Sequence, residues 1–276
     1  MNSINLESTD PNNYIGAGFS GGQQTIANFF DGQIDNLAFW NIALDESQIN
    51  YYQDPTITGD EEGLIGYWSF NSGSGDIAYD HTGNQKHGDV NGASWNLIPV
   101  PGDNNSLSFD GDDDYVVLEN KPISGSVDQF TILAFFKTNR LNSESQYIYY
   151  QGGDYKDISL SLNNNYHDSE NPNSDYTLGF HIAVSQGGQG NAFVPTGIIS
   201  ENTWHQSAVV WDGAYVYIYV DGTLVTTINY NKTNLVGDPI SQGKIFESQL
   251  ADEIVLLNFE RVNLDNNIYY FNFLKE

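Results

Sequence analysis

VYIYVDGT, residues 216–223, shows the fold class most directly. Valine and isoleucine alternate with tyrosine over five residues, which is the period of a strand with two different faces. Asp221-Gly222 follows at once, and an Asp-Gly pair favours the tight turn of a β-hairpin because it suits positive φ. The stretch therefore predicts a strand, a two-residue turn and a second, antiparallel strand.

The same pattern recurs through most of the chain. Short runs of β-branched and aromatic residues are separated by turns of Gly, Asn and Asp, as in YVVL (115–118), FTILAFF (130–136), SAVVW (207–211) and EIVLLNF (253–259). Roughly a dozen such runs after residue 63 predict an all-β protein in which two antiparallel sheets pack as a β-sandwich. One short helix is expected at residues 44–49, where Asp45 can cap the N-terminus.

Composition limits the partners and the chemistry. The 276 residues include 36 acidic and 9 basic side chains, for a net charge of −27. Nucleic acids and anionic membranes would be repelled by this charge, so neither is expected as a partner. No apolar run is long enough for membrane insertion. The chain has no cysteine, which excludes disulfides, zinc-thiolate sites and thiol nucleophiles, and its first residues do not resemble a signal peptide.

Two segments, one near each end, have similar sequences. Residues 30–52, FDGQIDNLAFWNIALDESQINYY, have a degenerate second copy in residues 250–270, LADEIVLLNFERVNLDNNIYY. Asp35 aligns with Asp252, and residues 14–17 upstream align with residues 235–238. Because the offset of about 220 residues is the length of a domain, it indicates tandem homologous domains, the first of which has lost its beginning.

A succession of short motifs runs through residues 63–274. GLIGYWSF (63–70) is followed by Thr82-Gly83-Asn84, Leu107-Ser108-Phe109-Asp110-Gly111, Trp204-His205 and Tyr219-Val220-Asp221-Gly222. In this order they resemble the laminin-G-like, or concanavalin A-like, jelly-roll domain. The resemblance implies a two-sheet sandwich, and a recognition module that works outside the cell or at its surface, or in a virion.

The resemblance also suggests a division of the chain. Residues 1–54 are interpreted as the C-terminal part of a preceding domain, residues 55–62 as a polar linker and residues 63–276 as a complete domain. Strands need neighbours, so residues 1–54 are not expected to fold alone. Three explanations stay open: the chain is a piece of a longer tandem protein, residues 1–54 complete a domain of another chain or copy, or they lie against the second domain.

An enzyme is not predicted. A retaining glycosidase of this fold needs two carboxylates about 5 Å apart in one groove, and the Glu-x-Asp-x-x-Glu signature of the related glucanases is absent. His205 is expected to pack or to form hydrogen bonds. His81 and His87 are interpreted as surface residues, and His181 has no partner that the sequence identifies.

Calcium is the expected metal, because acidic turns offer carboxylate and carbonyl oxygens. The resemblance places a site at one rim of the sandwich, with Asp154, Asp157 and Asp238 as ligands. Asp80 is a further candidate, which either caps its own turn or binds a structural ion.

The acidic turn at residues 110–114 has aspartates at positions one, three and five, as an EF-hand loop does. The match fails, because Tyr115 takes the place of the glycine and Lys121 that of the bidentate glutamate. The turn is therefore interpreted as an exposed connection between strands.

Tyrosines in two loop regions suggest contact with a glycan. Aromatic faces beside Asn, Asp and Gln suit sugar rings, and the candidates are Tyr150, Tyr155, Tyr166 and Tyr176. The alternative is that these side chains pack within a half-buried sheet.

Two function classes follow. The first is a non-catalytic adhesion or recognition module that binds a polysaccharide or glycoprotein with the help of calcium. The second is a structural protein of a surface layer, filament or virion, in which the jelly roll and residues 1–54 make subunit contacts.

Overall fold

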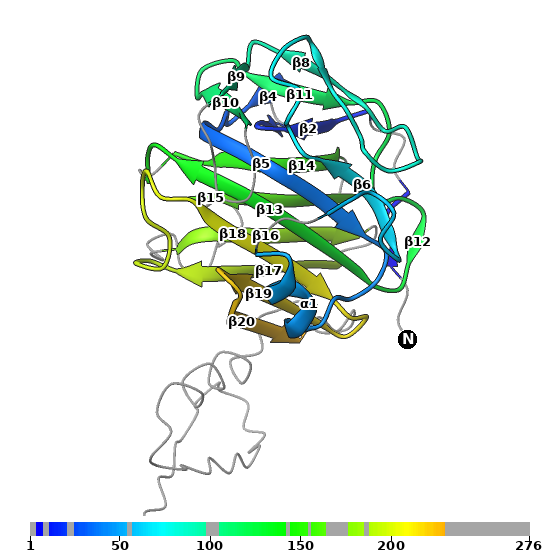
Figure 1. Cartoon of the computed structure of the whole chain (residues 1–276). Coiled ribbons are helices and arrows are strands. Elements are labelled where there is room, and N and C mark those ends of the chain that lie inside the picture. The colour runs from blue at the N-terminus through cyan, green and yellow to red at the C-terminus, as the bar shows by residue number, and fades with distance from the viewer. Residues whose placement is uncertain are drawn as a thin grey trace, which may run out of the picture. The chain divides into compact units, whose positions relative to one another are not determined.

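A computed structural model describes residues 4–7, 11–20, 25–53, 57–97, 105–141, 144–153, 156–163, 176–184 and 188–229. These residues form two eight-stranded antiparallel sheets that lie one over the other, with a single short helix among them (Figure 1). The predicted all-β sandwich is therefore confirmed.

The first sheet has the strand order β20-β19-β18-β13-β5-β10-β9, and β6 pairs with the second half of β5. Its strands are β5 (Asp31–Trp40), β6 (Leu64–Trp68), β9 (Ser94–Asn96), β10 (Ser106–Asp110), β13 (Phe130–Thr138), β18 (His205–Trp211), β19 (Tyr215–Val220) and β20 (Thr223–Asn229).

The second sheet has the order β17-β16-β15-β14-β2-β11-β8-β7. Its strands are β2 (Asn13–Ile15), β7 (Ile77–Ala78), β8 (Gly88–Asn91), β11 (Tyr115–Leu118), β14 (Gln146–Gly153), β15 (Lys156–Leu162), β16 (Tyr176–Val184) and β17 (Gly188–Pro195). Two short pairs lie outside both sheets: β1 (Ile4–Asn5) with β12 (Ser126–Val127), and β3 (Gly18–Ser20) with β4 (Thr25–Ala27).

The hairpin expected at residues 216–223 joins β19 to β20. Asp221 and Gly222 form its turn with φ values of 49° and 74°, and Val220 pairs with Thr223 across it. Both central residues have positive φ, as the turns that match strand twist require. This prediction is confirmed.

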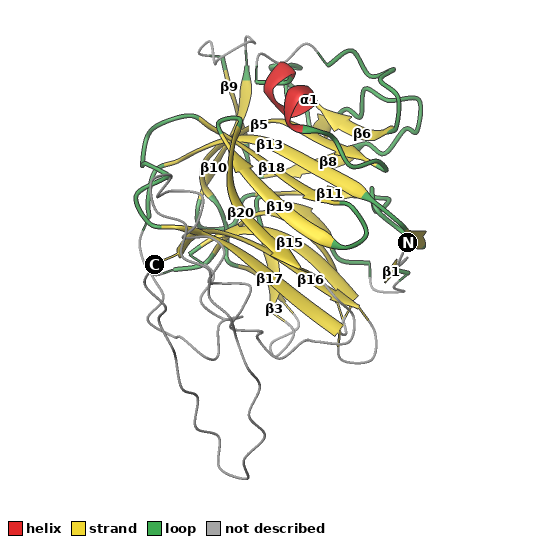
Figure 2. Cartoon of the chain, turned by 90° about the horizontal axis from the view of Figure 1, so that it is seen from below, coloured by secondary structure: helices red, strands yellow, loops and turns green. Residues whose placement is uncertain are grey.

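The predicted helix is α1 (Glu46–Tyr51). The Asp45 carboxylate accepts a hydrogen bond from the Gln48 N–H at 2.8 Å, and the Gln48 side chain accepts one from the Asp45 N–H at 2.9 Å, which is a capping box. The helix lies beside the first sheet (Figure 2). Apolar side chains of both elements form one buried cluster, which includes Trp40, Leu44, Ile49, Leu133 and Val210.

Residues before the predicted linker supply central strands to both sheets. β5 pairs with β13 on one side, and with β10 and then β6 on the other; Figure 1 shows blue β5 beside green β13. β2 pairs with β11 and β14. Strands from both sides of residues 55–62 thus share the same two sheets. The descent of residues 1–54 from a preceding domain stays a prediction.

The main core lies between the sheets. Phe39 of β5 packs edge-on against Trp68 of β6, with ring centroids 5.8 Å apart, and against Tyr149 of β14 at 4.8 Å. All three rings are fully buried. The N-terminal segment therefore contributes to the centre of the core as well as to the sheets.

Candidate ligand and cation sites

A polar hollow of about 590 Å³ lies where three chain segments meet. Its lining comes from the start of β2, the turn after β7 and the loop after β11, and consists of Pro11, Asn13, Asn84, Lys86, Glu119, Asn120, Lys121 and Ser124. Its volume lies within the range of sites for small ligands, but it is open to solvent and its lining is polar, whereas most such sites are lined by apolar side chains. Amide, ammonium, hydroxyl and carboxylate groups together can pair with both hydroxyl hydrogens and hydroxyl oxygens.

The turn around Asp80 holds one wall of this hollow. Asp80 is 5% exposed, and its Oδ1 accepts hydrogen bonds from the N–H groups of Tyr67 at 3.1 Å and Thr82 at 2.9 Å. Its Oδ2 accepts one from the Lys86 N–H at 2.9 Å, and the Thr82 hydroxyl donates to the same carboxylate. These bonds fix the backbone that presents Asn84 and Lys86 to the hollow.

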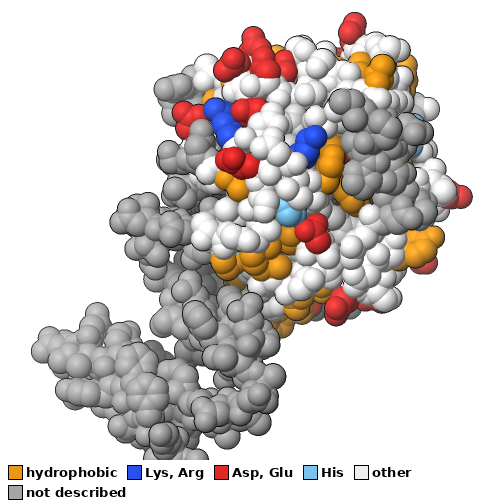
Figure 3. Space-filling view, turned by 60° about the vertical axis from the view of Figure 1, so that its left-hand side comes forward, with side chains coloured by type: hydrophobic (Ala, Val, Ile, Leu, Met, Phe, Trp, Pro, Cys, Tyr) orange, Lys and Arg blue, Asp and Glu red, His pale blue; other side chains and the backbone are white. Residues whose placement is uncertain are grey.

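Two of the chain's few lysines line the hollow. The Lys86 ammonium donates to the Pro122 carbonyl at 3.2 Å, which ties the Asp80 turn to the loop after β11. Burial lowers the pKa of Lys86, and the charge of Asp80 opposes that shift. On the face that Figure 3 shows, acidic side chains are scattered with few basic ones between them. With two lysines and one glutamate in its lining, the hollow has more positive than negative side chains, whereas the whole chain has a net charge of −27.

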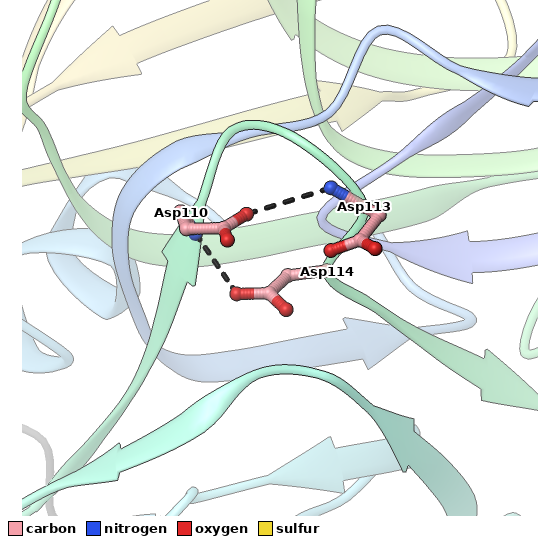
Figure 4. A group of neighbouring side chains, drawn as sticks. All are labelled: Asp110, Asp113 and Asp114. Atoms are coloured by element: carbon pink, nitrogen blue, oxygen red, sulfur yellow. Dashed lines mark hydrogen bonds between the residues drawn. The ribbon is translucent and has the colours of Figure 1, made fainter.

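The acidic turn between β10 and β11 brings three carboxylates together. Asp110, Asp113 and Asp114 each place a carboxylate oxygen within 4.8 Å of the others, and they are the one such group among the described residues. Figure 4 shows the three side chains gathered inside the turn. The Asp114 carboxylate accepts from the Asp110 N–H at 2.9 Å, and Asp110 accepts from the N–H groups of Asp112 and Asp113.

Asp114 is the buried member of this group, at 7% exposed. Burial raises the pKa of the Asp114 carboxyl, the hydrogen bond from Asp110 lowers it, and the charges of Asp110, Asp113 and Asp112 raise it further, with a net increase. Asp110 and Asp113 are exposed, as the sequence predicted for the whole turn. Three converging carboxylate oxygens suit a hard cation such as calcium.

Two of the predicted site residues share the outer face of the second sheet. Tyr150 pairs with Ser159, and Gly152 with Asp157, so Tyr150 and Asp157 lie diagonally on one face. Tyr150 is only 6% exposed and packs edge-on against Tyr147, with ring centroids 5.7 Å apart. Its ring is therefore used for packing within the protein, and contact with a sugar stays a prediction.

Asp157 has a histidine partner that the sequence did not identify. Its Oδ1 lies 3.4 Å from Nε2 of His181, and Nδ1 of His181 lies 2.6 Å from the Asn191 side-chain oxygen. The register brings them together: Ser159 pairs with His181, which pairs with Asn191. The three residues are distant in sequence, so only the pairing of β15, β16 and β17 reveals the contact.

Asp154, Tyr155, Tyr166 and Asp238 lie outside the described residues, and Tyr176 begins β16 but its side chain also lies outside them. Asp80 is not among the residues that line the hollow, and its carboxylate accepts hydrogen bonds from its own turn. Asn13, Asn120 and Lys121 were not predicted as lining residues, because each is a polar loop or strand-end residue without a motif.

The histidines mostly have structural roles. His205 is buried; its Nε2 accepts from the Ser200 N–H at 3.0 Å, and its Nδ1 lies 2.8 Å from Asp221 Oδ2, which confirms the predicted hydrogen-bonding role. His81 is exposed, with Nε2 2.9 Å from the Ser69 hydroxyl. His87 is half-buried and accepts from the Asp80 N–H.

In the described part of the chain, no helix is long and apolar enough to cross a bilayer.

Comparisons with known proteins agree with this fold. Residues 110–246 match the family model of the concanavalin A-like lectin/glucanases superfamily, in its laminin-G form. A protein of Prochlorococcus marinus (strain MIT 9313), described as "Putative imidazole glycerol phosphate synthase subunit hisF2", is 51% identical over 37 residues, which are 13% of this chain and 14% of that protein.

The chain spans only this small part of the Prochlorococcus protein, so nothing about activity carries over from it. No solved structure matches the chain significantly. The family match over residues 110–246 and the two stacked antiparallel sheets together show that the chain carries a concanavalin A-like domain of the laminin-G type, a family of generally non-catalytic binding modules that has some glucanase members.

Proposed function

We propose that this protein is a non-catalytic recognition module that works outside the cytoplasm and binds the glycan of a polysaccharide or glycoprotein in the polar hollow. The observation that carries the proposal is the hollow's lining of amides, lysines and a carboxylate. The family supports a more general role and not a particular ligand: concanavalin A-like modules of this type are lectin-like or adhesive, and are typically extracellular.

Sugar hydroxyls both donate and accept hydrogen bonds, and so do the amides of Asn84 and Asn120. The ammonium groups of Lys86 and Lys121 donate to ring and hydroxyl oxygens, and Glu119 accepts from hydroxyls. A carboxylate- or sulfate-bearing sugar gains from the two lysines at short range, whereas the net charge of −27 opposes its approach. That opposition is screened beyond about 8 Å at physiological salt.

Calcium belongs to the proposal as a structural ion in the acidic turn. The turn precedes β11 and the hollow's loop follows it, so four residues of strand, roughly 13 Å, separate the two. An ion held by Asp110, Asp113 and Asp114 would therefore not touch a glycan in the hollow. It would stabilise the β10–β11 connection. The rim residues Asp154, Asp157 and Asp238 stay candidates for a second ion.

Binding of a panel of neutral and acidic oligosaccharides to the full chain tests the proposal by isothermal titration calorimetry. A ligand that binds the unaltered chain should lose at least tenfold in affinity with Lys121→Ala or Asn120→Ala, because each removes a hydrogen-bonding group of the hollow. Lys137→Ala is the matched control, since Lys137 lies on β13 and does not line the hollow. Equal losses in all three variants would contradict a site in the hollow.

Assembly is the second candidate function, and the repeat at the two ends of the chain favours it. A structural protein built from this domain needs segments that link subunits, and a strand-rich segment can link them by β-augmentation. Oligomers that form with rising concentration, and no binding to any glycan of the panel, would favour assembly over recognition.

A further inference from the structure

The outer face of the second sheet carries a row of polar side chains that the proposed function does not use. Tyr150, Ser159, His181 and Asn191 are in register across β14, β15, β16 and β17, so their side chains lie on one face. Asp157, two residues before Ser159 on β15, shares that face. The sheet therefore places a carboxylate, a hydroxyl and an imidazole beside one another.

Asn191 determines which nitrogen of His181 carries the proton. An amide oxygen only accepts hydrogen bonds, so Nδ1 of His181, 2.6 Å from the Asn191 oxygen, is the donor. In the neutral imidazole the other nitrogen, Nε2, then has a lone pair and no hydrogen. Metal-binding histidines are oriented in the same way, by a hydrogen bond from the ring nitrogen that does not bind the ion.

The lone pair of His181 faces a carboxylate. Nε2 lies 3.4 Å from Oδ1 of Asp157, and two acceptor atoms in this position repel unless a cation lies between them. If that cation were a proton, the charge-assisted N–H···O bond would typically be about 2.7–2.9 Å long. In a tetrahedral site with metal–ligand bonds of about 2.1 Å, two ligand atoms lie about 3.4 Å apart. The separation of Nε2 and Oδ1 fits a metal ion better than a proton.

Ser159 provides an independent observation. Its side chain is 1% exposed, and its Oγ has no hydrogen-bond partner in the part of the chain that the structure describes. A buried hydroxyl without a partner is costly. Ser159 is the direct cross-strand partner of His181 and lies two residues from Asp157. An ion held by those two side chains would lie beside this hydroxyl, which can bind it and so gain the partner it lacks.

We propose that Asp157, His181 and Ser159 form a site for Zn²⁺. Imidazole and carboxylate together suit this ion, whereas calcium prefers oxygen ligands alone. The site therefore differs from the calcium site of the acidic turn and from the calcium site expected at the rim, for which Asp157 was also a candidate. Three protein ligands leave the fourth position of a tetrahedral ion to water.

The ion would join two neighbouring strands, since Asp157 and Ser159 belong to β15 and His181 to β16. Tyr150, buried on the other side of Ser159, limits access of water from that side. The inference does not depend on glycan binding in the hollow, because none of these side chains lines it.

Isothermal titration calorimetry of the full-length chain with zinc chloride tests the site. The solutions contain millimolar calcium, which competes at sites made of oxygen ligands alone. His181→Gln and Asp157→Asn should each reduce the zinc affinity at least tenfold, and Ser159→Ala should reduce it less, because a neutral hydroxyl is the weakest of the three ligands. His81→Gln is the matched control, since His81 is exposed and lies in the turn after β7.

The titrations separate the proposed site from unspecific zinc binding. We expect one zinc ion for each unaltered chain and an unchanged affinity with His81→Gln. Absence of binding to the unaltered chain would overturn the proposal. So would an affinity that His181→Gln and Asp157→Asn leave unchanged, or an equal loss with His81→Gln.

If the altered chains fail to fold, the unaltered chain still tests the site. Co²⁺ accepts the same ligands as zinc, and its paramagnetism broadens the nuclear magnetic resonance signals of nearby amides. As cobalt chloride is added, the signals of residues 157–159 and 181 should broaden before those of residues 110–114 in the acidic turn, and zinc chloride should restore them. Broadening that begins in the acidic turn, or that zinc does not reverse, would overturn the proposal.

Discussion

Two turns of this molecule each begin with an aspartate but surround it in opposite ways. In the turn at Asp80 one buried carboxylate is surrounded by donors, from the N–H groups of Tyr67, Thr82 and Lys86 and the Thr82 hydroxyl. In the acidic turn three carboxylates face one another, and they accept hydrogen bonds from the backbone N–H groups of Asp110, Asp112 and Asp113 in the turn itself. The first turn is complete without an ion, whereas the second has negative charge to spare.

The difference shows what distinguishes a structural aspartate from a cation ligand. Both turns begin with Asp and contain Gly, but residues 80–84 (DHTGN) have one carboxylate and residues 110–114 (DGDDD) have four. The two turns differ in the number of hydrogen-bond donors for each carboxylate. Some of these donors come from strands outside the turn, as the Tyr67 N–H of β6 does for Asp80.

The largest expected effect is that of Asp80→Ala. Removal of the carboxylate leaves three backbone N–H groups in and beside a buried turn without an acceptor, and each such group costs about 1–3 kcal/mol. The free energy of unfolding, measured in urea, should fall by about 3 kcal/mol. Asp80→Asn keeps one acceptor oxygen and should lose less. A loss below about 0.5 kcal/mol for Asp80→Ala would show that the turn does not depend on this carboxylate.

Calcium should raise the thermal midpoint of the unaltered chain. An ion that binds only the folded state contributes about 1.4 kcal/mol at ten times its dissociation constant. Asp113→Asn and Asp114→Asn should abolish the shift between EDTA and calcium, and Asp157→Asn is the matched change at the rim. A shift that Asp157→Asn abolishes and the other two variants keep would move the ion from the acidic turn to the rim.

Without calcium, Asp114→Asn should raise the thermal midpoint at neutral pH. The pKa of Asp114 is raised in the folded state, mainly by burial, so the folded state holds this proton more tightly. Protonated Asp114 therefore stabilises the fold at pH values below its pKa in the unfolded state. This contribution is lost as the pH rises through its pKa in the folded state. At neutral pH the ionised group therefore costs stability, which the amide avoids. Unfolding in EDTA at pH 7 measures the change, and a lower midpoint for Asp114→Asn would contradict it.

The smallest expected effect is that of Asp221→Asn. Asp221 lies in a third turn and, like Asp80, its carboxylate accepts hydrogen bonds from neighbouring groups. Burial raises the pKa of Asp221, but hydrogen bonds from His205 and the Gln206 N–H outweigh burial, and the net pKa is lowered. Its contribution to stability is thus present above the unfolded pKa and is lost as pH falls through the folded pKa. Asp221→Asn should reduce the loss of stability on acidification. Its half-exposed side chain limits the size of the change.

Features set by neighbouring residues could be predicted from the sequence. The Asp221-Gly222 turn and the capping box of α1 depend on residues one to three positions apart, so their motifs were sufficient. Contacts between distant strands were not predictable in this way. The place of β5 beside β13 joins residues about a hundred positions apart, and no local pattern encodes that register.

The same limit explains the candidate sites. The acidic turn was visible because its aspartates are adjacent, but the burial of Asp114 depends on how closely the turn at Gly92 approaches; a Cβ on Gly92 would lie 2.1 Å from its Oδ1. The hollow combines residues near positions 13, 84 and 120, which are separate loops in the sequence. His181 meets Asp157 only because β15 and β16 are neighbours.

The central position of β2 and β5 has a consequence for synthesis on the ribosome. Both strands emerge early, but Ile15 meets its partner Tyr149 only after 134 further residues have been made. At about 5–20 residues per second this takes roughly 7–27 s. For most of that interval β5, an apolar strand that ends in Phe39 and Trp40, has no β13 to pair with, because Trp40 meets Thr131 only when that residue has been made, and the unpaired edge is a natural target for chaperones. Codons that slow translation between β6 and β13 would lengthen this exposure, and should lower the yield of soluble protein more than the same codons placed after β14.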